Sequence, residues 1–242
     1  MAGSGPTRRC ADHPRRRSLP VWSTVVDVGR QDRALPLPTM DEPFLLILTG
    51  PPGAGKSTVG HAIADRFDRS SCLESDWFWT TIVHGFVRQW DQDADAQNRA
   101  VVAAFMAAAT RLVGGGFVTV VEGMVGPWHL DLVRDELHAA GITAHYIVLR
   151  PDLATCLSRA KARAGTERVP GHPPLTEDGP IRLMWERFAP LGRYESHVID
   201  TTHLSVRTTT DVVLERLEGG HATLPLRDLG TDGPGPPVLE PG

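Results

Sequence analysis

Short apolar runs alternate with helix-period patterns between residues 44 and 218. Runs typical of buried strands stand at 44–49, 70–75, 117–121, 145–149 and 197–200. Apolar residues at helical spacing predict helices directly after the first run and at 95–113, 130–140, 151–164, 181–188 and 213–217. This alternation predicts an α/β fold in which a parallel sheet is covered by helices on both faces. Ligands of such sheets bind beyond the carboxyl ends of the strands.

The two ends of the chain lack this pattern. Residues 1–41 are Arg-rich and residues 219–242 hold eleven Gly or Pro, so both are predicted to be disordered tails around a domain at 42–218. The Arg-rich head has other interpretations, namely a nucleic-acid arm, a targeting peptide, or a start codon set too early, since Met40 stands just before the first strand.

A glycine-rich loop joins the first strand to the first helix. Its residues are Gly50, Pro51, Pro52, Gly53, Ala54, Gly55, Lys56, Ser57 and Thr58. Strand, loop and helix in this order are the context of a phosphate-binding loop, or P-loop, whose backbone N–H groups surround a β-phosphate. Lys56 would reach the β- and γ-phosphates of ATP, and the Ser57 hydroxyl would bind Mg²⁺. Only two of the 25 basic residues are lysines, Lys56 and Lys161. In a chain that otherwise uses arginine, a lysine at position 56 strengthens the assignment of a phosphate-binding loop.

Carboxylates follow the second and third strands. Asp76 could accept the proton of a substrate hydroxyl, or it could cap a helix. Glu122 could hold Mg²⁺ through water or contact the substrate, although Asp is commoner in the metal role. The aromatic residues Trp77 and Trp128 could line the substrate pocket or belong to the core. His129 is expected to be an ordinary surface histidine.

Arginines follow the fourth strand, in front of a Pro- and Gly-rich stretch. Arg159 and Arg163 share one helix face, and Arg168 lies in the stretch itself. A lid at about 163–176 would bring arginine charge to a transferring phosphoryl group, whereas the alternative is a solvated helix running into a loop. After the fifth strand, Thr201 either lies near the adenine ring or caps the next helix.

Charge and cysteine content limit the partners and the cell compartment that we expect for this protein. The first forty residues carry seven Arg and three Asp, so their net charge is +4 and the remainder carries −8. This acidic body makes nucleic acid an unlikely partner. Three scattered cysteines suit the reducing cytoplasm, and no apolar run approaches the length of a membrane span. The sequence gives no oligomeric state.

Taken together, these motifs resemble the small P-loop kinases. The family includes gluconate and shikimate kinases, chloramphenicol phosphotransferase, zeta-toxin-type kinases and tunicamycin-resistance proteins. The resemblance rests on the P-loop, Asp76-Trp77, Val-Val-Glu-Gly, Leu-Ser-Arg-Ala-Lys-Ala-Arg and Val-Ile-Asp-Thr-Thr-His, and it covers about 44–218. It implies a nucleoside-monophosphate-kinase-like, three-layer P-loop fold with five parallel strands and a mobile lid. Lys56 and Ser57 would bind phosphate and Mg²⁺, Asp76 would be the base, and Arg163 and Arg168 would be lid arginines.

Phe78 stands where shikimate kinases place a second Asp, so the pocket is not expected to fit shikimate. The leading hypothesis is ATP-dependent phosphorylation of a small-molecule hydroxyl, on a metabolite or an antibiotic. Two alternatives are a kinase for nucleic-acid ends and a nucleotide-binding protein that sequesters a ligand or signals without transferring phosphate. A shared fold does not separate the three.

Overall fold

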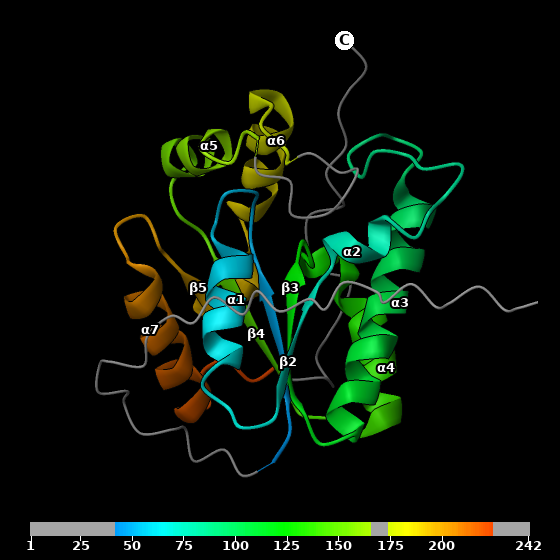
Figure 1. Cartoon of the computed structure of the whole chain (residues 1–242), viewed down its shortest axis with the longest axis vertical. Helices are drawn as coiled ribbons and strands as arrows, with labels where there is room; N and C mark the ends of the chain where they lie inside the picture. The colour runs from blue at the N-terminus through cyan, green and yellow to red at the C-terminus, as the bar shows by residue number, and fades with distance from the viewer. Residues whose placement is uncertain (1–41, 166–173, 225–242) are drawn as a thin grey trace, which may run out of the picture. The chain divides into compact units, whose positions relative to one another are not determined.

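Five parallel strands form the centre of the molecule, in the order β2-β3-β1-β4-β5 (Figure 1). The computed structural model describes residues 42–165 and 174–224. The strands are β1 (Leu45–Thr49), β2 (Ser70–Glu74), β3 (Val118–Gly123), β4 (Ala144–Leu149) and β5 (Val198–Ile199). The predicted α/β class and the five-stranded all-parallel sheet are confirmed.

The central strand β1 shows why its first four residues, Leu45 to Leu48, are all apolar. Successive side chains of a strand point to opposite faces of the sheet. Leu45 and Ile47 join one buried cluster, and Leu46 and Leu48 join another on the opposite face. Both faces of β1 are therefore buried away from water. A strand in this position needs a continuous run of apolar residues, whereas a strand with one exposed face alternates apolar and polar residues.

Helices cover both faces (Figure 1). The cluster of Leu46 includes residues of α1 (Lys56–Ala64) and α7 (Val206–Glu218). The cluster of Leu45 includes residues of α3 (Asp95–Gly114) and α4 (Leu130–Ala140). Gly141 ends α4 in the left-handed conformation, which glycine adopts without steric cost. None of the described helices is both long and apolar enough to cross a membrane.

Other helices lie beyond the carboxyl ends of the strands, at the top of Figure 1. Two of them, α5 (Leu153–Lys161) and α6 (Asp178–Phe188), share a small third core of Cys156, Ala160 and Ile181. The Asp152 side chain accepts a hydrogen bond from the Thr155 N–H (2.7 Å), so α5 begins two residues after the predicted Pro151 start. The short elements are α2 (Asp76–Trp79) and the 3-10 helices η1 (Pro127–His129) and η2 (Gly192–His197).

The chain continues in an ordered form to Leu224, beyond the predicted tail boundary at 219. The Ala222 carbonyl accepts from the Tyr146 N–H and the Leu224 N–H donates to the Ala144 carbonyl, both at 2.8 Å. Because β5 pairs only with the end of β4, this segment covers the edge that the first half of β4 would otherwise expose. The predicted tails at 1–41 and 225–242 lie outside the described residues.

Candidate active site

The P-loop runs between the end of β4 and the start of α5. Gly50 and Gly53 both have positive φ, at 144° and 82°. A Cβ at Gly50 would collide with the carbonyl of Leu149, and one at Gly53 with the carbonyl of Cys156. Glycine is therefore required twice, by conformation and by the close approach of neighbouring backbone.

The first turn of α1 offers free N–H groups beside this loop. Gly55 stands at the N-cap in the left-handed conformation, and no side chain caps the helix. Uncapped N–H groups and the helix dipole together favour a bound anion. The Lys56 ammonium lies over the loop and donates to the Pro51 carbonyl (3.1 Å). The residues predicted to bind phosphate thus form one cradle.

Glu122 lies at the base of the cradle. It lies within β3, one residue before the strand ends and not after the strand as predicted, in register with Leu48 of β1. The Ser57 hydroxyl donates to its Oε1 (2.9 Å). Burial raises the pKa of this carboxyl, while Lys56 and the Ser57 hydrogen bond act in the opposite direction. Burial also lowers the pKa of the Lys56 ammonium, against the attraction of Glu122 and Asp76. The half-buried Lys56 and the buried Glu122 are therefore within electrostatic reach of each other beside the P-loop.

Asp76 approaches the same centre from β2. It is exposed, yet its charge acts on both Lys56 and Glu122. It occupies the first position of α2, where Ser75 stands at the N-cap and no side-chain capping bond forms. The capping role considered for Asp76 therefore finds no support in this geometry.

Glu74 was not singled out from the sequence. It pairs in register with Glu122, and its charge helps to raise the pKa of that carboxyl. His61 contacts its Oε1 at 2.9 Å. The signal that could have found Glu74 is its place at the end of a strand, but that signal depends on knowing that β2 and β3 are neighbours.

The aromatic candidates differ in surroundings. The Trp77 side chain is 47% exposed beside Asp76. Trp128 is half-buried, packs on Gly126 and lies edge-on to Phe188 at 5.5 Å between ring centroids. It belongs largely to the wall of the core and presents only part of its surface.

His129 is buried, and the expectation of a surface histidine is wrong. Only 5% of it is exposed, since it lies at the junction of η1 and α4 among core residues. Burial lowers its pKa to about 4, and the nearby Arg99 guanidinium adds to this effect. The ring is therefore neutral at physiological pH.

The predicted helix at 151–164 ends at Lys161, so Arg159 lies on α5 whereas Arg163 lies in the turn that follows it and does not share its helix face. Arg159 Nη2 donates to the Thr201 carbonyl (3.2 Å), which ties α5 to the turn after β5. Arg163 lies near enough to Lys56 for its charge to lower the pKa of that ammonium. Arg168 and most of the predicted lid, at 166–173, lie outside the described residues.

The turn after β5 is held by a network that sequence analysis did not identify. Thr202 donates from its hydroxyl to Asp200 Oδ1 (2.6 Å) and accepts from the Asp152 N–H (2.8 Å). Thr201 itself is buried, with 2% exposed. The network fixes the Thr201 backbone, to which Arg159 is bound.

Oxygen donors for Mg²⁺ are few. No group of three or more His, Cys, Asp or Glu able to hold a metal occurs within 42–165 and 174–224. The Ser57 hydroxyl and the Glu122 carboxylate do adjoin, and this small donor set fits Mg²⁺, which keeps several waters and binds substrate phosphates.

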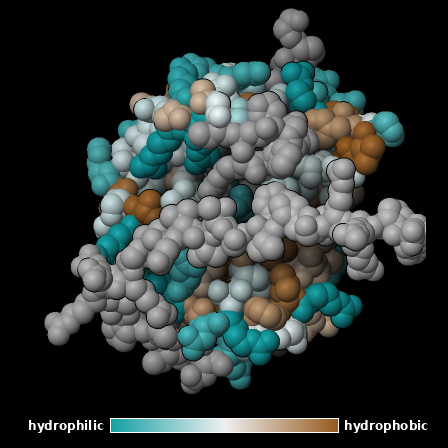
Figure 2. Space-filling view, viewed as in Figure 1, coloured by the Kyte–Doolittle hydropathy of each residue, from teal (hydrophilic) through white to brown (hydrophobic). Residues whose placement is uncertain are grey.

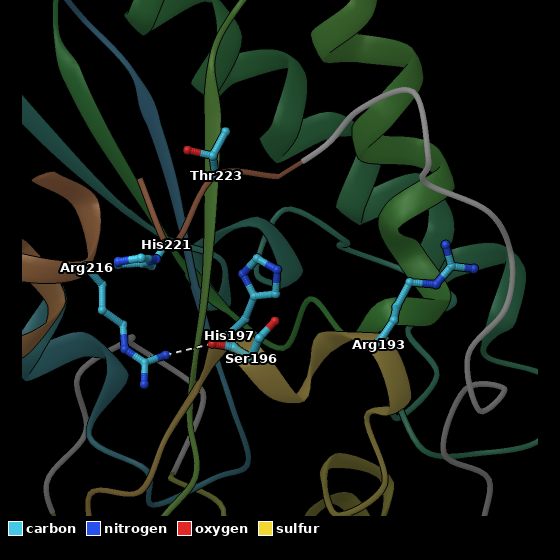
Figure 3. A pocket seen from close by; sticks show the side chains of 6 residues that line it. All are labelled: Arg193, Ser196, His197, Arg216, His221 and Thr223. Atoms are coloured by element: carbon cyan, nitrogen blue, oxygen red, sulfur yellow. Dashed lines mark hydrogen bonds between the residues drawn. The ribbon is translucent and has the colours of Figure 1, made fainter. Parts of the chain in front are cut away.

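A separate hollow of about 640 Å³ lies elsewhere (Figure 3). Its lining comprises Arg193, Ser196, His197, Arg216, His221 and Thr223. Arg216 donates to the Ser196 carbonyl (2.8 Å), and His197 Nδ1 contacts the Tyr146 carbonyl oxygen (2.9 Å). These residues flank the first half of β4, whereas the P-loop contacts its end, so this hollow is not part of the site at the strand ends.

Known proteins share this architecture. The tunicamycin resistance protein of Deinococcus radiodurans superposes with a TM-score of 0.53 at 17% identity, over 76% of this chain and 99% of that one. Shikimate kinase from Acinetobacter baumannii, solved with shikimate, gives 0.51 at 19% identity, over 74% and 94%. At such low sequence identities, these superpositions show a common fold and nothing more.

Sequence similarity adds a partial match and a family. A cytidylate kinase of Maridesulfovibrio salexigens is 39% identical over 62 residues, which are 26% of this chain and 28% of that relative. Residues 45–191, more than half of the chain, match the family AAA_33, described as an AAA domain. The expected resemblance is thus confirmed: the chain belongs to the AAA domain family AAA_33 and has the fold of the small P-loop kinases.

Proposed function

We propose that the protein transfers the γ-phosphoryl group of ATP to a hydroxyl of a small molecule. The observation that carries the proposal is the convergence of three charges at adjacent strand ends. Lys56 follows β1, Asp76 follows β2, and Glu122 is the last residue but one of β3. The charges of Glu122 and Asp76 act on the pKa of Lys56, and the charges of Lys56 and Asp76 act on the pKa of Glu122. The half-buried Lys56 ammonium could hold the phosphoryl group during its transfer, and the exposed Asp76 carboxylate could take up the proton that the acceptor hydroxyl loses.

The division of labour follows from exposure. The P-loop N–H groups and Lys56 would bind the β- and γ-phosphates, and Arg163 would add positive charge near the transferred group. Asp76 is exposed, so it can meet an acceptor hydroxyl and take its proton. Glu122 is buried and bonded to Ser57, so it suits the floor of the site better than the acceptor side.

Ser57 and Glu122 are the residues that would hold Mg²⁺, Ser57 directly and Glu122 through water. The ion, when bound, neutralises phosphate charge. In its absence the Ser57 hydrogen bond keeps the Glu122 side chain in place. Arg159 and Thr201 would border the adenine ring, since their contact joins α5 to the turn after β5.

Transfer of label from ATP tests the proposal. The full chain is incubated with Mg²⁺, γ-labelled ATP and a panel of hydroxylated metabolites and antibiotics, and label is sought on each compound. Label on an acceptor, lost in Lys56→Ala and kept in Lys161→Ala, supports the proposal. Lys161 is a matched control because it is an exposed lysine paired with Asp178. Tight ATP binding without transfer to any compound would instead identify a nucleotide-binding protein.

A further inference from the structure

The hollow at the first half of β4 is lined by basic and hydroxyl-bearing side chains (Figure 3). They come from three parts of the chain: Arg193, Ser196 and His197 from η2, Arg216 from α7, and His221 and Thr223 from the segment after α7. None of the six is acidic, and the volume of about 640 Å³ lies in the range of small-molecule sites. Figure 3 shows Arg193 and Arg216 on opposite sides of the hollow, with Ser196 and His197 between them. A concave surface lined by positive charge attracts an anion.

Hydropathy singles out no comparable surface on the face shown in Figure 2. Hydrophilic and hydrophobic residues are interspersed among the described residues of that face. Isolated apolar residues are ordinary on a protein surface. Charge and concave shape, which coincide in the hollow, are therefore the stronger sign of a ligand.

Arg216 is held in position without a carboxylate. Among the residues that the structure describes, its side chain forms one hydrogen bond, from Nη1 to the Ser196 carbonyl (2.8 Å), and no ion pair. The His221 N–H donates to the Arg216 backbone carbonyl (3.0 Å), which keeps these two basic residues together. Burial lowers the pKa of His197, and the Arg216 charge adds to this effect, so the guanidinium lies close to that ring as well. The remaining guanidinium N–H groups suit a phosphate, which accepts several charge-assisted hydrogen bonds.

The nearest carboxylates do not neutralise this charge. Glu195 stands next to Ser196 in the sequence, but its two oxygens accept from Nη1 and Nη2 of Arg150 (3.0 and 2.9 Å). This hydrogen bonding to Arg150 lowers the pKa of Glu195, so the carboxylate stays ionised within that pair. Glu215 and Glu218, the acidic neighbours of Arg216 along α7, are exposed and do not line the hollow. Residues one or two positions apart do not face each other on a helix.

We propose that the hollow is a second anion site that binds a phosphate group, with Arg216 as the principal cationic contact and His221, Ser196 and Thr223 as further hydrogen-bond donors. These donors come from three parts of the chain, which suits a tetrahedral phosphate with oxygens in several directions better than a planar carboxylate. The hollow flanks the first half of β4, whereas the P-loop contacts the end of that strand. The inference therefore does not depend on the proposed function.

Calorimetry with inorganic phosphate tests the site. The full chain is first saturated with Mg²⁺ and a non-hydrolysable ATP analogue, which fill the P-loop, and acetate at the same ionic strength is the comparison anion. Phosphate is expected to bind saturably and at least about tenfold more tightly than acetate, because it accepts more hydrogen bonds. Arg216→Ala should weaken phosphate binding at least about tenfold, through loss of charge-assisted bonds. Arg111→Ala, which alters an exposed arginine in the last turn of α3, should bind like the parent.

The ring resonance of His221 gives a readout from the hollow itself. It is assigned by its absence in His221→Ala, and it should move with phosphate in the parent and in Arg111→Ala but not in Arg216→Ala. His221 is exposed, so His221→Ala should fold and bind phosphate a few-fold more weakly, which keeps the test valid if thermal unfolding shows that Arg216→Ala is unfolded. A parallel titration with glycerol 3-phosphate tells whether free phosphate or a phosphate ester is the better ligand.

Three results would overturn the inference. The first is no saturable binding of phosphate or of glycerol 3-phosphate once the P-loop is filled. The second is acetate that binds as tightly as phosphate. The third is phosphate binding, or a shift of the His221 resonance, that is the same in the parent and in folded Arg216→Ala.

Discussion

The proposed phosphate side and the proposed acceptor side of the candidate site are built differently. On the phosphate side, backbone approaches so closely that only glycine fits at Gly50 and Gly53, while Lys56 is half-buried and Glu122 is buried. On the acceptor side, Asp76 and Trp77 are exposed, and side-chain hydrogen bonds from α3 hold the connection that follows. Close backbone contacts that leave no room for a side chain fix the phosphate side, whereas a few side-chain hydrogen bonds fix the acceptor side.

This contrast indicates where specificity can vary. ATP presents the same phosphates to every such enzyme, so a rigid cradle suits it, and its buried charges need no rearrangement during the reaction. The acceptor differs from protein to protein, and an exposed surface on a tethered connection can change its side chains without disturbing the sheet. Changes on the phosphate side should therefore abolish activity, whereas changes on the acceptor side should redirect it.

The largest effect is expected at Lys56. Lys56→Ala removes the ammonium that would hold the β- and γ-phosphates, so ATP turnover should become undetectable. The fold should persist, because burial of the ammonium is itself unfavourable. Turnover and thermal unfolding are measured beside Lys161→Ala. Equal turnover in Lys56→Ala and the parent would contradict the P-loop assignment.

Asp76→Asn should lower the rate of phosphoryl transfer less than Lys56→Ala does, but the loss should still be large. It keeps the shape of the side chain and removes the proton acceptor, and loss of a general base costs about 10² to 10⁴ in rate. Single-turnover transfer and ATP affinity are compared with those of Asp68→Asn, an exposed Asp on the turn between α1 and β2. Transfer within a few-fold of the parent would leave Asp76 with no catalytic role.

The free energy of unfolding at acid pH should depend on the buried histidines. The pKa of His129, and likewise of His145, is lowered to about 4 by burial. The unfolded chain therefore takes up protons first, and the free energy of unfolding should fall as pH drops from about 6.5 toward 4. Each group contributes at most about 3 kcal/mol.

Two histidines, one at the N-cap of α4 and one in its last turn, sharpen this prediction. His129→Gln should flatten the fall in the free energy of unfolding between pH 6.5 and pH 4, whereas His138→Gln, which alters an exposed residue of α4, should not. Denaturant unfolding at several pH values measures both. Identical slopes in the two variants would show that His129 is protonated in the folded protein.

The smallest effect is expected at Arg159. Arg159→Ala removes the bond to the Thr201 carbonyl and loosens α5 from the turn after β5, so ATP affinity should fall only a few-fold. Arg182→Ala, an exposed arginine of α6, is the control. If adenine lies elsewhere, calorimetry with ATP will give the same affinity for Arg159→Ala and the control.

The strand, loop and helix of the proposed phosphate side could be predicted from sequence because local chemistry determines them. A strand, a glycine-rich turn and a helix are contiguous, so their geometry follows from neighbours in the chain. The place of Asp76 and Glu122 at strand ends also followed, since parallel strands end at one edge. Glu74 was missed because its nearness to Glu122 depends on which strands are neighbours.

Two further features depend on long-range packing. His129 is polar, but Trp128 and Leu130 on either side draw it into the core, and a single polar residue gives no periodic signal. Ala222 and Leu224 lie in a glycine-rich stretch that composition assigns to a tail, yet they pair with β4 because the two-residue β5 leaves that edge open.

Acceptor-dependent consumption of ATP tests the central claim most directly. The full chain is given Mg²⁺ and ATP with and without an accepted alcohol, and loss of ATP is compared with the appearance of the phosphorylated alcohol. The account predicts that ATP loss rises many-fold with the alcohol, that product matches ATP consumed, and that Asp76→Asn binds ATP like the parent but forms little product. ATP hydrolysed at the same rate with and without the alcohol, with no phosphorylated product, would contradict it.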